Sequence, residues 1–151
     1  MYRKVLLAYD GSVEGRVALR EGAMLARLCQ AEVVLLAVVN LSAGIMMAEG
    51  AAPGAARHQR DAYARILAEG VERLKALGFS PEARLEFGTP VHAITEAARQ
   101  SGADLVVVGH RQQGPLARWW GGSVGSGLMD DLPCSLLVAQ NEMRDTGPAG
   151  D

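Results

Sequence analysis

The stretch VVVGHRQQGPLARWWGGSVGS, residues 106–126, joins an apolar run to a polar loop and then to the start of a predicted helix. The apolar run ends at Gly109, and Gly122 and Ser123 open the helix. Backbone N–H groups at a helix N-terminus lack partners within the helix and carry the positive end of its dipole. A strand, a glycine loop and a helix start in this order therefore predict an anion-binding site.

The rest of the chain alternates between the same two kinds of pattern. Short apolar runs bounded by turn residues predict strands at 4–10, 33–39, 83–87, 105–108 and 135–140. Helical spacing of apolar residues predicts helices at 13–28, 57–77, 90–100 and 123–131. The strand at 83–87 alternates apolar and charged residues, which places it near a sheet edge. The order predicts an α/β protein with helices on both faces of a sheet.

Several residues are expected to set where the helices begin and which of their faces are buried. Ser12 and Thr89 are predicted N-caps, and Pro90 takes the first helical position after Thr89. In the first helix, Val17, Met24 and Leu28 follow helical spacing and are predicted to face inward. In the second helix, the predicted inward residues are Tyr63, Ile66, Leu67, Gly70, Val71, Leu74 and Leu77.

The length of 151 residues suits one domain with one core. We expect this domain at 1–140, a mobile alanine- and glycine-rich loop at 41–56 and a flexible tail at 141–151. A net charge of -2 without clustered lysine or arginine argues against nucleic-acid binding. No apolar run approaches a membrane span or a signal core, so we expect a cytoplasmic protein without membrane contact. Cys29 and Cys134 are interpreted as packing residues, and no metal site is predicted.

In open α/β sheets, ligands bind beyond the carboxyl ends of the strands, where the strand order reverses. The loops at 9–12 and 109–126 both follow strands and are candidates for the two walls of one crevice. Asp10 in the first loop supplies a carboxylate that accepts hydrogen bonds from hydroxyl or amino groups of a ligand. The turn Asp10-Gly11-Ser12 also reads as a purely structural helix cap, and both interpretations stay open.

The segments VLLAYDGS, LLAVV, GTPVHAI and DLVVVGHRQQGPLARWWGGSVGSGLMDDLPCSLLVA together resemble the universal stress protein family over most of the chain. The resemblance implies a Rossmann-like, adenine nucleotide alpha hydrolase-like fold, with a five-stranded parallel sheet of strand order 3-2-1-4-5. It also implies an adenine nucleotide, ATP or AMP, as ligand, with Mg²⁺ only through bound nucleotide. The site residues that it implies are Ala8, Tyr9, Asp10, Val38, Gly109, Gln112, Gly122, Ser123 and Val124.

The roles implied for these residues follow the parts of a nucleotide. Asp10 and the backbone of Ala8 and Tyr9 would meet the adenosine, and Val38 would face the adenine. Ribose and phosphates would be met by Gly109, Gly122, Ser123 and Val124. Nucleotide-binding members of the family carry a second glycine in this loop, where this chain has Gln112. A glycine there lets the backbone approach the phosphates, so Gln112 is the residue on which triphosphate binding should depend.

The catalytic signals are weak. The spacing of Gly109 and Gly114 begins a P-loop, but Pro115 and Leu116 stand where lysine and serine or threonine are required. His110 is the one candidate general base in the loop, and we interpret it as a surface or ligand-contact residue. We therefore expect a binding or signalling module and no enzyme.

Three alternatives remain beside a nucleotide sensor. They are a nucleotide-independent stress adaptor, a slow ATPase and a flavodoxin-like electron carrier. The last strand, from Ser135 to Gln140, is apolar and is expected at a sheet edge. The resemblance implies a homodimer paired through this strand, with a further protein partner that the sequence does not identify.

Overall fold

The computed structural model describes residues 1–40, 54–110 and 130–140. The element order is β1 (Lys4–Ala8), α1 (Val13–Cys29), β2 (Glu32–Val39), α3 (Ala55–Ala76), β3 (Glu82–Phe87), α4 (Pro90–Ser101), β4 (Leu105–Gly109) and β5 (Ser135–Ala139). All neighbouring strands pair in parallel, in the order β3-β2-β1-β4-β5. The predicted fold class and strand order are therefore confirmed.

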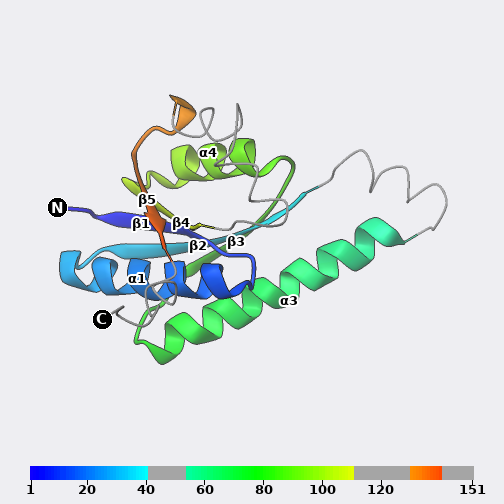
Figure 1. The fold of residues 1–151 in the computed structure, drawn as a ribbon, viewed down its shortest axis with the longest axis horizontal. Helices are drawn as coiled ribbons and strands as arrows, with labels where there is room; N and C mark the ends of the chain where they lie inside the picture. The colour runs from blue at the N-terminus through cyan, green and yellow to red at the C-terminus, as the bar shows by residue number, and fades with distance from the viewer. Residues whose placement is uncertain (41–53, 111–129, 141–151) are drawn as a thin grey trace, which may run out of the picture.

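The sheet lies between two layers of helix, with α1 and α3 on one face and α4 on the other (Figure 1). Successive side chains of a strand point to opposite faces, so each central strand supplies both layers. In β1, Val5 and Leu7 pack under α1 and α3, and Leu6 packs under α4. Apart from Lys4 and Glu32 at their first positions, the central strands are apolar because both of their faces are covered.

The edge strand β3 shows a different pattern, as the sequence predicted. Its residues are half-buried or exposed, and Phe87 at its end is 46% exposed. At the opposite edge, Leu136, Leu137 and Val138 of β5 are only partly buried. The two edges of the sheet are thus less covered than its centre.

Helix α1 begins as predicted, since the Ser12 hydroxyl accepts a hydrogen bond of 3.0 Å from the N–H of Gly15. The predicted inward face was wrong at Met24 and Leu28, which are 61% and 82% exposed. The buried face instead consists of small residues and one leucine: Gly15, Ala18, Leu19, Gly22, Ala23 and Ala26. Small side chains let the helix approach the sheet closely, and a Cβ on Gly22 would lie 2.3 Å from Leu7 Cδ2.

Two smaller expectations also need correction. Thr89 has N-cap backbone geometry before α4, but its side chain makes no capping hydrogen bond. The region predicted as a loop at 41–56 ends earlier, because Ala55 and Ala56 form the first turn of α3 after Gly54 takes a positive φ of 95°. Alanine is the strongest helix former, which favours this earlier start. The remainder of that loop and the tail at 141–151 lie outside the described residues.

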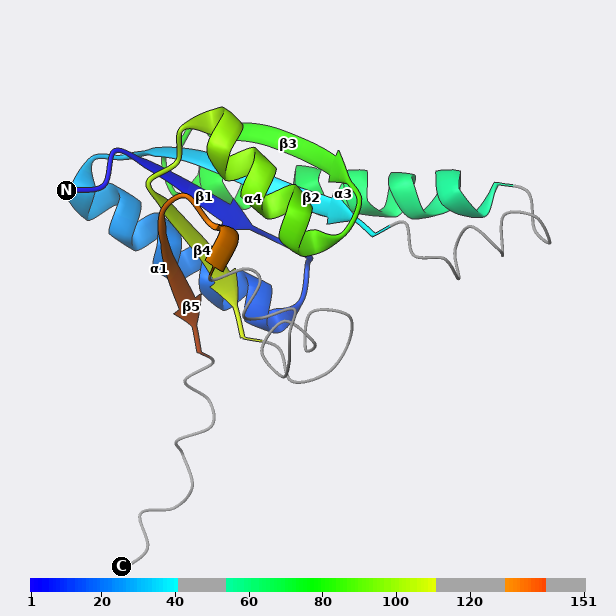
Figure 2. The same ribbon diagram turned by 90° about the horizontal axis from the view of Figure 1, so that it is seen from above.

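The long helix α3 ends close to the predicted position, followed by Gly78 with a φ of 92°. Gly70 and Leu74 are buried, and Ile66, Leu67 and Val71 pack against the core. Leu77 is 39% exposed and is the C-cap, so its predicted inward position was wrong. The N-terminal part of α3 projects beyond the sheet in both views (Figures 1 and 2).

Candidate functional site

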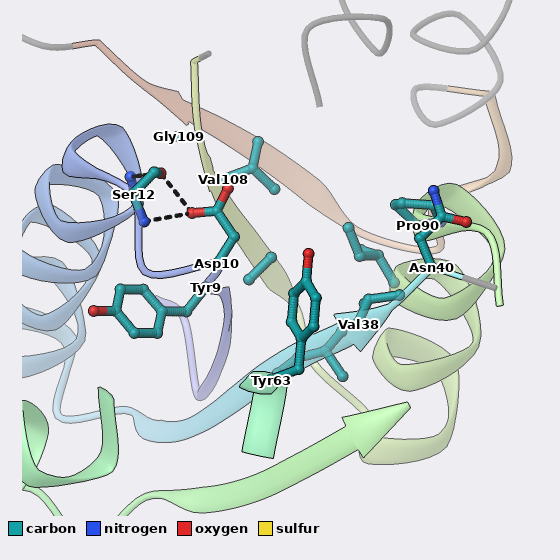
Figure 3. Close-up of a pocket in the computed structure, with 13 residues that line it drawn as sticks. Tyr9, Asp10, Ser12, Val38, Asn40, Tyr63, Pro90, Val108 and Gly109 are labelled. Atoms are coloured by element: carbon teal, nitrogen blue, oxygen red, sulfur yellow. Dashed lines mark hydrogen bonds between the residues drawn. The ribbon is translucent and has the colours of Figure 1, made fainter. Parts of the chain in front are cut away.

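A pocket opens at the carboxyl ends of β1, β2 and β4, next to the start of α4 (Figure 3). It contains about 680 Å³ of atom-free space, part of which is open to solvent. The described residues that line it are Ala8, Tyr9, Asp10, Ser12, Gly15, Leu36, Val38, Asn40, Tyr63, Pro90, Ile94, Val108 and Gly109. The strand order reverses between β1 and β4, so the pocket occupies the position expected for a ligand site in an open sheet.

Five of the nine predicted site residues line this pocket: Ala8, Tyr9, Asp10, Val38 and Gly109. The other four predicted residues, Gln112, Gly122, Ser123 and Val124, lie outside the described residues. The predicted helix at 123–131 also lies mostly outside them, and Asp130 and Asp131 are helical. The structure therefore brings together the part of the predicted site that precedes the glycine loop.

Asp10 lies at the polar side of the pocket, in the turn between β1 and α1 (Figure 3). Its Oδ1 accepts a hydrogen bond of 3.0 Å from the N–H of Ser12, and a second hydrogen bond from the Ser12 hydroxyl. Asp10 thus has a structural role at the start of α1, as one of the two interpretations predicted. The same carboxylate lines the pocket, and a carboxylate is chemically suited to accept hydrogen bonds from ligand hydroxyl or amino groups.

Gly109 at the end of β4 is required by close packing. A Cβ at this position would lie 2.5 Å from the carbonyl oxygen of Glu14 and 3.1 Å from the N atom of Gly15. Gly15 is equally constrained, since its Cβ would lie 2.6 Å from Asp10 Oδ1. Gly109 therefore lets the end of β4 approach the start of α1, and Gly15 leaves room for the Asp10 carboxylate at the polar side of the pocket.

Tyr9 contributes differently from its neighbour Asp10, because its side chain packs in the core beneath α1 and α3 and is 3% exposed. Its hydroxyl donates to Glu69 Oε1 at 3.2 Å, and burial raises the pKa of the phenol. The same carboxylate oxygen accepts a 2.7 Å bond from Arg73 Nε, which lowers the pKa of Glu69. Tyr9 therefore links the strand end to α3, while Figure 3 shows its ring directed away from Tyr63.

The opposite side of the pocket is mostly apolar. Leu36 and Val38 of β2, Ile94 of α4 and Val108 of β4 belong to the core layer beneath α4, and all four line the pocket. Leu36 and Ile94 are fully buried. The pocket therefore has one polar side near Asp10 and one apolar side near Val38. Such a pocket suits a ligand that has one polar part and one apolar part.

The lining residues that sequence reasoning did not assign to the site include Tyr63 and Asn40. Tyr63 was assigned to the inward stripe of α3, whereas Figure 3 shows its ring standing in the pocket with the hydroxyl toward Asp10 and Val108. Asn40 follows β2 directly, and a polar residue just beyond a buried strand is the signal that could have identified it.

His110, the candidate general base, is not one of the described residues that line the pocket. Its backbone N–H donates to the Ala139 carbonyl at 2.9 Å and so extends the pairing of β4 with β5. Within the described lining, the ionisable side chains are one carboxylate and two phenols. In the described parts of the chain, no helix has the length and apolar character of a membrane span.

The fold and the pocket define an α/β protein with a candidate site at the switch point of a parallel sheet. The sequence model of the universal stress protein family matches residues 1–140. The chain therefore belongs to the universal stress protein family.

Individual relatives agree with this assignment. Universal stress protein YxiE of Bacillus subtilis is 30% identical over 148 residues, which cover 93% of this chain and all of YxiE. A universal stress protein solved in complex with cAMP is 25% identical, with a TM-score of 0.67 over 91% of this chain and 97% of its own. A family protein from Arabidopsis thaliana with AMP bound superposes with a TM-score of 0.64, at 18% identity and 97% coverage of each chain.

Proposed function

We propose that this protein is an adenine-nucleotide-binding module of stress response or signalling. The observation that carries the proposal is the pocket in which Asp10 on a polar side faces the apolar side around Val38. The relatives solved with cAMP and with AMP support adenine nucleotides as the ligand class. ATP and AMP are both candidates, and Mg²⁺ would enter only with a bound nucleotide.

The chemistry of the pocket fits the parts of such a ligand. A carboxylate accepts hydrogen bonds from ribose hydroxyls, and an apolar wall favours a flat base. In the sequence, Gly122 and Ser123 open a predicted helix, whose N–H groups suit phosphate. We place the adenosine between Asp10 and Val38 and the phosphates toward the glycine loop.

We also propose that the protein binds its nucleotide without efficient turnover. In the described lining, the Ser12 hydroxyl is engaged in capping α1, since it donates to Asp10 and accepts from the N–H of Gly15. The sequence also lacks the lysine and hydroxyl of a P-loop. Phosphate release that survived repurification and disappeared with Asp10→Ala would contradict this part of the proposal.

Titration calorimetry and thermal unfolding with AMP, ADP and ATP test nucleotide binding. We expect binding heat and a raised Tm with at least one of the three, because a ligand that binds only the folded state stabilises it. Asp10→Asn keeps an oxygen that can accept from Ser12 but removes the charge, and it should weaken binding without unfolding α1. No heat and no shift at millimolar nucleotide would overturn the proposed function.

The nucleotide-independent stress adaptor remains a second candidate because Gln112 replaces the glycine of the nucleotide-binding members. If the Gln112 side chain obstructs the phosphate chain, Gln112→Gly should strengthen ATP binding more than AMP binding. Copurified nucleotide in gently prepared protein would count against the adaptor.

We propose a homodimer paired through β5. Support comes from the place of β5 at the edge of the sheet and from its partly buried leucines. An apolar edge strand with unpaired backbone groups favours association with a second strand.

A further inference from the structure

The apolar side of the pocket carries two residues that can recognise a base, and neither belongs to the glycine signature. Tyr63 comes from α3 and Asn40 from the end of β2, so segments far apart in the sequence meet here. Val38 and Asn40 are two positions apart, and alternate residues of an extended chain point to the same side. Asn40 therefore continues the wall that Val38 begins, and both line the pocket.

Tyr63 is held in the pocket by the anchoring of α3 further along the chain. Gly70 packs against the Tyr9 ring and Leu35 so tightly that a Cβ there would lie 2.7 Å from each. Leu74 is fully buried one turn later, and Glu69 accepts the Tyr9 hydroxyl and pairs with Arg73. These contacts fix the register of α3 and hold the Tyr63 ring among Asp10, Val38 and Pro90 (Figure 3).

Asn40 lies on the side of the pocket away from Asp10, with its amide near Pro90 (Figure 3). An amide group offers both a donor and an acceptor, and asparagine pairs with the 6-amino group and N7 of adenine. Guanine presents two acceptors at the same edge, so one asparagine cannot satisfy it in the same way. The side chain thus has the chemistry to prefer adenine.

We propose that Tyr63 and Asn40 form the base-recognising side of this pocket, Tyr63 by stacking on the base and Asn40 by hydrogen bonding to its edge. The inference rests on the proposed function and names the residues that give it base specificity. Stacking of an aromatic ring on a base depends on the ring and not on its hydroxyl. Phenylalanine at position 63 should therefore preserve binding of the base, whereas alanine at this position should weaken it.

Calorimetry of the full chain with AMP and GMP tests both residues. Tyr63→Ala should weaken AMP binding about 10-fold or more, and Tyr63→Phe should stay within about 2-fold of the parent protein. Asn40→Ala should lower the ratio of AMP affinity to GMP affinity about 10-fold. Arg60→Ala, an exposed change on the same helix, is the matched control and should leave both affinities unchanged.

Saturation-transfer NMR supplies a readout that does not depend on a destabilising variant. In deuterated protein with protonated tyrosine, saturation should reach the base protons of AMP, and Tyr63→Phe should remove most of the transfer, leaving only what comes from Tyr9 in the pocket lining. Undiminished transfer in Tyr63→Phe, or AMP binding by Tyr63→Ala at the parent affinity, would overturn the assignment of Tyr63. An unchanged AMP to GMP ratio in Asn40→Ala would overturn that of Asn40. Either of these results would leave the proposed function standing. Absence of any nucleotide binding by the parent protein would overturn the proposed function together with the assignments of Tyr63 and Asn40.

Discussion

At the scale of single residues, Asp104 shows how one side chain joins two strands. Its Oδ2 accepts from the N–H of Arg3 at 2.8 Å, and its Oδ1 accepts from the N–H of Lys4 at 3.1 Å. The Asp104 N–H in turn donates to the Lys4 carbonyl at 3.0 Å. Burial opposes ionisation of the carboxyl, but the backbone N–H bonds outweigh it, and the pKa of Asp104 lies below its usual value.

This pKa predicts how stability depends on pH. A carboxyl whose pKa is lower in the folded state stabilises the fold above its unfolded pKa, and the contribution disappears as pH falls through the folded value. Asp104→Asn should therefore lower the free energy of unfolding by about 1 kcal/mol at neutral pH, and the difference should vanish in acid. Urea unfolding across this pH range measures it.

The matched control is Glu32→Gln, because Glu32 forms a largely exposed ion pair with Lys4 at 3.4 Å. Exposed pairs contribute little, so this variant should stay within about 0.5 kcal/mol of the parent protein. A difference for Asp104→Asn that persisted unchanged in acid would show that the charge of Asp104 does not cause the effect.

At the scale of elements, α1 provides a paired test of which face is buried. Leu19 is 4% exposed and packs on the sheet, whereas Leu28 is 82% exposed on the same helix. Leu19→Ala should lower the free energy of unfolding by about 2–5 kcal/mol, because it removes buried methyl groups and leaves a cavity. Leu28→Ala should change it by less than about 0.5 kcal/mol. Thermal and urea unfolding compare them directly, and similar losses in both variants would contradict the orientation of α1.

At the scale of the whole molecule, the proposed homodimer predicts that the outer edge of β5 is paired. The Ala139 carbonyl points to β4, since it accepts from His110. Backbone groups of successive strand residues alternate in direction, so those of Leu136 and Val138 point to the outer edge. We expect their amide hydrogens to be protected from exchange in concentrated protein and to lose protection on dilution. A monomeric mass with rapid exchange of both amides at all concentrations would contradict the dimer.

The sequence by itself determined the fold class, the strand order and the placement of Ala8, Asp10, Val38 and Gly109 around one crevice. It could do so because buried strands, helix caps and the family motifs are local patterns, and parallel topology brings strand ends together. The buried face of α1 and the direction of the Tyr9 ring were decided only by the tertiary structure.

The position of Tyr63 in the pocket was also decided only by the tertiary structure. Periodicity shows that a helix has an apolar stripe, but it does not show how closely that stripe approaches the sheet or where the helix extends beyond it. Those features depend on packing: Gly22 against Leu7 sets the approach of α1, and Gly70 against Tyr9 sets the position of α3. The physical reason is that close packing is a property of two surfaces in contact, which no single segment contains.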